Sequence, residues 1–102
     1  MAVTDKRFCK GTFGNTIQTL YTTPASTTAV IKAITICNKS ASQHTISLKL
    51  AGTFVIYNHA IGAYDTITIP FIDQILSATE LIEGNASSAS AVNYFISGKE
   101  IT

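Results

Sequence analysis

The sequence is short of charged residues. Asp, Glu, Lys and Arg together make up 13% of its 102 residues, about half of the ~25% that is usual for soluble domains. The formal net charge is +1, whereas a broad nucleic-acid interface needs many clustered Lys and Arg side chains. We therefore expect a protein that does not bind nucleic acid.

Cysteine and long apolar segments are scarce as well. The two cysteines, Cys9 and Cys37, belong to no Cys-x-x-Cys motif and are too few for a disulfide framework. No apolar run approaches the ~20 residues of a membrane-spanning helix, and the first residues lack the apolar core of a signal peptide. These absences predict a cytoplasmic product without a membrane anchor, in which Cys37 is a small buried side chain.

Motifs of catalytic and metal sites are missing too. Neither His44 nor His59, the only histidines, has a Cys or an acidic residue at metal-ligand spacing. Glu80 and Glu83 would face opposite sides of one strand, so they do not form a catalytic pair. A Ser–His–acid triad can assemble from distant residues and is not tested by spacing. We expect no enzyme, no metal and no cofactor.

Hydroxyl-bearing and β-branched residues take the place of charge. The chain has 15 Thr, 9 Ser, 14 Ile and 4 Val, and the β-branched residues among these favour strands over helices. A surface with little charge and many hydroxyl groups costs little to dehydrate, which suits burial against neighbouring subunits. A β-rich surface without such a role would have the same composition.

Short strand patterns recur along residues 16–102, with turn signals roughly every 8–12 residues, as in β-sandwiches and barrels. Residues 27–38 are apolar on both faces and should form a central strand, and residues 44–50 alternate. The apolar spacing in residues 71–79 allows a short helix. We predict one all-β domain over 16–102, an antiparallel β-sandwich of about seven short strands, either Ig-like or jelly-roll-like.

Residues 1–15 are polar, and we interpret them as an extended N-terminal arm. They contain the one basic cluster of the chain, followed by an aromatic residue between two glycines. A solvated terminus is the simplest interpretation of this arm. The alternative is a docking segment for an acidic partner, for which the candidate residues are Lys6, Arg7, Lys10 and Phe13.

Two segments carry a resemblance to a known class of proteins. In Leu20 to Ser40, a Tyr-x-x-Pro turn leads into a β-branched strand that ends at Asn38, whose side chain can hydrogen-bond the backbone of the following turn. In Ala91 to Ile101, a final strand ends near Ser-Gly-x-Glu. Together with residues 75–76 and 81–84, these segments resemble small virion structural proteins of tailed phages.

The resemblance covers roughly residues 16–102 and implies a virion protein that is made in the host cytoplasm. We expect a capsid decoration, or cement, protein that binds the outer capsid surface in many copies. Its partners would be the major capsid protein or other virion proteins, and it would form a homo-oligomer, for which a trimer suits a cement protein. The alternatives are a tail, neck or baseplate protein and, with less support, a carbohydrate-binding module for host attachment.

Overall fold

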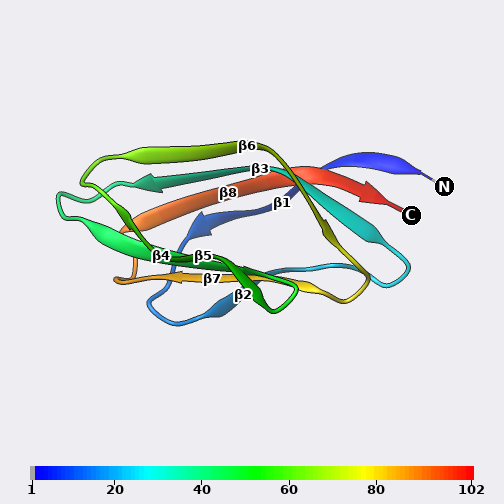
Figure 1. Ribbon diagram of the computed structural model, residues 1–102, viewed down its shortest axis with the longest axis horizontal. Coiled ribbons are helices and arrows are strands. Elements are labelled where there is room, and N and C mark those ends of the chain that lie inside the picture. Colours follow the sequence, from blue (N-terminus) through cyan, green and yellow to red (C-terminus); the bar gives the residue numbers. More distant parts are fainter. Residues whose placement is uncertain (1) are drawn as a thin grey trace.

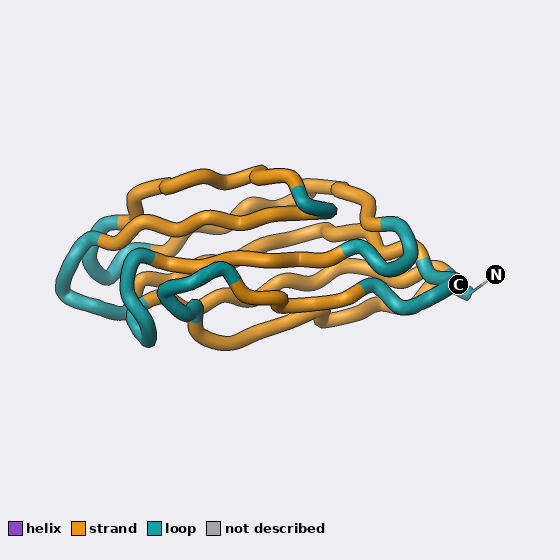
Figure 2. The backbone as a smooth tube through the Cα atoms, turned by 90° about the horizontal axis from the view of Figure 1, so that it is seen from below, coloured by secondary structure: helices purple, strands orange, loops and turns teal. Residues whose placement is uncertain are grey.

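The computed structural model describes residues 2–102, and of residue 71 only the backbone. Eight strands and no helix make up the regular structure of these residues (Figure 2). In chain order the strands are β1 (Val3–Thr12), β2 (Gln18–Thr22), β3 (Thr28–Asn38), β4 (His44–Leu50), β5 (Thr53–Ile61), β6 (Thr66–Leu76), β7 (Leu81–Ala86) and β8 (Val92–Ile101). The predicted all-β fold is confirmed, with eight strands in place of about seven.

The strands form two antiparallel four-stranded sheets (Figure 1). The first sheet has the order β1–β8–β3–β6, and the second has the order β2–β7–β4–β5. β1 pairs with β8, β2 with β7, β3 with β6 and β4 with β5, as in a single long antiparallel ribbon that is wrapped around a core. This is the eight-stranded jelly-roll arrangement, which decides between the two predicted types of sandwich.

Residues 3–12 are extended, as predicted, but they do not form an arm outside the domain. As β1 they pair with β8 from Val3 opposite Ile101 to Thr12 opposite Asn93. The predicted boundary between residues 15 and 16 is therefore wrong. An edge strand needs few apolar residues, and on β1 only Phe8 is buried, with Cys9 partly buried beside it. The polar composition of β1 therefore resembles that of a solvated terminus.

The core lies between the two sheets. β3 is central in the first sheet, as predicted, and β4 turns the alternate residues Ile46, Leu48 and Leu50 inward. The short helix expected within residues 71–79 is absent, because residues 71–76 belong to β6. Residues 71–73 have no counterparts on β3, and this irregularity breaks the strand alternation and produces the helix-like apolar spacing.

The side chain of Asn38 is completely buried and fastens two turns together. Its Nδ2 donates to the carbonyl oxygens of Ser42, Ile61 and Gly62 at 2.8–3.1 Å. Its Oδ1 accepts from the backbone N–H of Ser40 at 3.0 Å. The predicted hydrogen bonding of Asn38 to the following turn is confirmed, and the contact also reaches the end of β5.

A line of β-bulges crosses the first sheet beside Gly98. Phe8 on β1 and Lys32 on β3 are the extra residues where the registers against β8 shift. A Cβ atom on Gly98 would lie 1.9 Å from the carbonyl oxygen of Val30 and 2.8 Å from the ring of Phe8. Only glycine therefore allows β8 to approach β3 this closely, and the bulges on either side redirect the neighbouring side chains.

We expect the substitution Gly98→Ala to lower the free energy of unfolding by about 3 kcal/mol or to prevent folding, because β3 would have to move away from β8. Gly62→Ala is the matched control, since nothing lies within 4 Å of a Cβ atom at that position, and it should change stability by less than about 0.5 kcal/mol. Urea unfolding followed by far-ultraviolet circular dichroism measures both. Equal stability of the two variants would contradict the close approach.

Candidate functional site

The strands of the first sheet carry most of the positive charge of the protein. Five of the seven Lys and Arg residues lie on them. Of the three acidic residues on the same strands, Glu100 accepts a hydrogen bond from Tyr21 of the second sheet, so only Asp5 and Asp73 oppose the cations on the outer side. The net charge of +1 is therefore unevenly distributed, because the first sheet carries five cationic residues and only two outward acidic residues. We call the surface formed by Lys6, Arg7, Lys10, Lys32, Phe95 and Lys99 the basic face.

Three of the four predicted docking residues, Lys6, Arg7 and Lys10, are exposed on this face. The fourth, Phe13, is only 1% exposed, and its ring packs against that of Tyr94 with 4.7 Å between centroids. Phe13 is buried because it follows β1 at the point where the chain leaves the first sheet. Its side chain belongs to the core, so the prediction that it docks on a partner is wrong.

Phe95 is the aromatic residue that accompanies the cations. It points outward from β8 and is 43% exposed, and the guanidinium carbon of Arg7 lies 6.0 Å from the centre of its ring. This distance is at the limit for a cation–π contact. Nothing in the sequence placed Phe95 beside Arg7, because the two residues belong to strands at opposite ends of the chain.

A hollow of about 430 Å³ lies over the line of bulges. It is lined by Asp5, Lys6, Arg7, Lys32, Ser97, Gly98 and Lys99. The ammonium group of Lys99 lies 3.0 Å from Asp5, and that of Lys32 lies 2.5 Å from Asp73. All four side chains are more than 40% exposed, so each ion pair contributes at most about 1 kcal/mol to stability and breaks readily.

A second hollow, of about 380 Å³, is lined in part by Phe95. Its lining includes Lys10, Thr35, Cys37 and Asn93. Lys10 is the direct partner of Phe95 across the strand pair, and Arg7 is the partner of Ser97, two residues further along β8. The face therefore offers an exposed aromatic ring beside two cations of the neighbouring strand. Aromatic residues and Arg are enriched at the centres of protein–protein interfaces.

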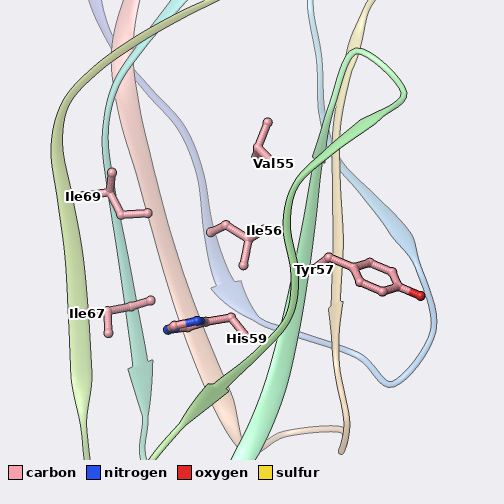
Figure 3. A pocket seen from close by; sticks show the side chains of 6 residues that line it. All are labelled: Val55, Ile56, Tyr57, His59, Ile67 and Ile69. Atoms are coloured by element: carbon pink, nitrogen blue, oxygen red, sulfur yellow. The ribbon is translucent and has the colours of Figure 1, made fainter.

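The edge of the sandwich at β5 and β6 has a different character (Figure 3). There, an apolar groove of about 470 Å³ opens between β5 and β6. Val55, Ile56 and His59 from β5 face Ile67 and Ile69 from β6, whereas Tyr57 points away into solvent. No charged residue other than a protonatable histidine lines this groove, so its ligand would be apolar.

Among residues 2–102, no group of three or more His, Cys, Asp and Glu side chains is placed to hold a metal ion. Ser87 Oγ lies 3.1 Å from Nδ1 of His44, but no described carboxylate is hydrogen-bonded to this histidine, and a triad needs that third member. None of the described residues forms a helix that is long and apolar enough to cross a membrane.

Two titratable groups lie beneath the basic face. Burial raises the pKa of the Cys9 thiol from its ordinary value of 9.0 to about 12. Burial, and in second place the charge of the Cys9 thiolate, raises the pKa of the Tyr94 hydroxyl. Both groups are therefore neutral at physiological pH and stabilise the fold in that form.

This burial predicts a loss of stability at alkaline pH. Between pH 9 and 12 the unfolded chain releases the Cys9 proton while the folded protein retains it, so raising the pH favours unfolding. The free energy of unfolding should be level below pH 8 and should decrease above pH 9. We expect Cys9→Ala to show a smaller decrease between pH 8 and pH 10.5 in urea titrations, and an equal decrease in both proteins would contradict the assignment to Cys9.

No protein-family model matches the chain, and no curated protein matches it. The jelly-roll fold is compatible with several functions, since viral capsid proteins, lectins and cupins share it. The basic face and the apolar groove are therefore the features on which a functional interpretation depends.

Proposed function

We propose that this protein is a structural component of a tailed-phage virion, and specifically a capsid decoration protein that binds the outer capsid surface in many copies. The observation that carries the proposal is the basic face, where Arg7, Lys10 and the exposed ring of Phe95 occur together on a rigid sheet. The sequence resemblance of residues 16–102 to small virion proteins supports it. The partner would be the major capsid protein or another virion protein.

The face suits attachment to a shell of repeated subunits. A single contact through a few cations and one aromatic ring is expected to be weak. A capsid presents the same site many times, however, so once one copy of an oligomer is bound, the effective concentration of the other copies near their sites is high and the overall affinity increases. Because β1 is paired with β8 along its whole length, docking through a mobile arm is replaced here by docking through a preformed surface, which loses less conformational entropy on binding.

Self-association is assigned to the β5 side of the sandwich. Edge strands usually carry charge or proline, which discourage association, and the other long edges follow this rule: β1 has four charged residues and β6 has Pro70 and Asp73. β5 has neither, and Phe54, Val55 and Tyr57 on it are large and exposed. We propose that copies meet here through side chains, as a trimer.

The attachment is tested by binding to purified phage heads that lack the protein. We expect unmodified protein to bind in hundreds of copies per head, and Arg7→Glu and Phe95→Ala to bind at least tenfold more weakly, because interface aromatic and Arg residues typically contribute this much. The matched controls are Lys39→Glu and Tyr64→Ala, since both side chains are exposed and lie in turns, outside the basic face and outside the β5 edge.

Equal weakening by both pairs of variants would contradict docking through the basic face. A copy number of about six or twelve per particle would instead assign the protein to the tail, neck or baseplate, where rings of that symmetry occur. Binding to a glycan array without binding to heads would favour the carbohydrate-binding alternative.

The assigned oligomer is tested by sedimentation equilibrium. Tyr57→Lys places a charge on the β5 edge and should shift a trimer toward monomer by at least tenfold in the association constant. Tyr64→Lys is the control, because Tyr64 is exposed to a similar degree, 72% against 67% for Tyr57, but lies in the turn after β5. A monomeric unmodified protein, or equal effects of both variants, would contradict the assignment.

A further inference from the structure

We infer that the basic face is a carboxylate-binding surface that the protein partly occupies with its own Asp5 and Asp73, and that carboxylates of an acidic protein partner displace these two side chains on docking. The inference rests on the proposed function only for the identity of the partner. The chemistry of the surface belongs to this chain and is measurable without any phage particle.

The two aspartates are held loosely: Asp5 lines the hollow, and Asp73 is paired with Lys32, which lines it too. Each is bound by one lysine through one carboxylate oxygen, Asp5 by Lys99 and Asp73 by Lys32. Their side chains are 88% and 59% exposed, respectively. An ion pair in such contact with solvent is easily replaced by another of the same kind. These pairs show how the lysines of the face bind a carboxylate, which is the group that an Asp or Glu of a partner presents.

Arg7 lines the same hollow as Lys32 and Lys99 and is the strongest candidate for the first contact. Among residues 2–102 it forms no ion pair within 4.0 Å, and its planar guanidinium can bind both oxygens of one carboxylate. Ser97, its neighbour across the strand pair, adds a hydroxyl donor to the same hollow.

Separate carboxylates fit this surface better than a phosphate backbone does. A nucleic acid carries closely and regularly spaced charges, and such a strand laid across the hollow would meet Asp5 and Asp73 as repulsive neighbours. Individual Asp or Glu side chains can replace the two aspartates one for one, so the number of ion pairs is kept. We therefore identify the ligand as an acidic segment of a protein surface.

Removing the carboxylate of Asp5 or Asp73 should tighten the binding of an acidic partner, although it also removes an ion pair of the folded protein. The probe is poly-L-glutamate, and its affinity for the full-length protein is measured by isothermal titration calorimetry at 50 mM and 300 mM NaCl. We expect Asp5→Asn and Asp73→Asn each to tighten binding about threefold, because each frees a lysine on the face. Arg7→Gln should weaken binding about tenfold, and all of these differences should shrink at the higher salt concentration.

Two variants separate this effect from a change in net charge. Asp65→Asn changes the charge by the same amount, but Asp65 lies in the turn between β5 and β6. Lys49→Gln removes a lysine from the second sheet. If Asp65→Asn tightens binding as much as Asp5→Asn and Asp73→Asn do, the displacement of internal aspartates is refuted.

Duplex DNA serves as the competing probe. If it binds to the unmodified protein more tightly than poly-L-glutamate of equal total charge, the assignment to carboxylates is wrong. Failure of the protein to bind phage heads would contradict the proposed function and leave this result unchanged, so the two failures are distinguishable. Loss of poly-L-glutamate binding in Arg7→Gln but not in Lys49→Gln would support the basic face as the site.

Discussion

The contact between Gly98 and the carbonyl group of Val30 is the constraint on which the first sheet depends. Because no side chain separates the two backbones, β8 lies close against β3, and the neighbouring strands accommodate it with the extra residues Phe8 and Lys32. Phe8 turns inward and packs at 4.7 Å against the ring of Tyr21 on the second sheet. Lys32 remains on the outer side, near Arg7. The same backbone contact thus determines both the position of Phe8 in the core and the position of Lys32 on the outer surface of the sheet.

The sequence allowed the fold class and several elements to be predicted, because strand periodicity is a local property. The central position of β3, the alternation of β4 and the role of Asn38 all follow from neighbouring residues. The pairing of residues 3–12 as an edge strand does not follow from neighbouring residues, because their partner is β8, at the other end of the chain. Irregular backbone was the second obstacle: the bulge in β6 shifts the phase of its apolar residues, and a shifted phase resembles a helical period.

The candidate site was predictable only in the part that is contiguous in sequence. Lys6, Arg7 and Lys10 stand out as a cluster along the chain, whereas Lys32 and Lys99 join them only through the pairing of three strands. Phe13 was misplaced, since its polar and glycine neighbours hide its burial in the core. Pairing across a sheet brings together residues from distant parts of the chain, and no local pattern encodes which of them become neighbours.

The pairing of β1 with β8 also determines when the first sheet can form during synthesis of the chain. β8 lies between β1 and β3, so the first sheet is completed only after residues 92–101 have been synthesised. Contacts of such long range fold slowly, because a long loop must close before any of them forms. Until then β1 and β3 have free edges, Phe8 and Ile31 lack their cover, and the chain is prone to aggregate. A nascent chain therefore has no assembled basic face until β8 has been synthesised.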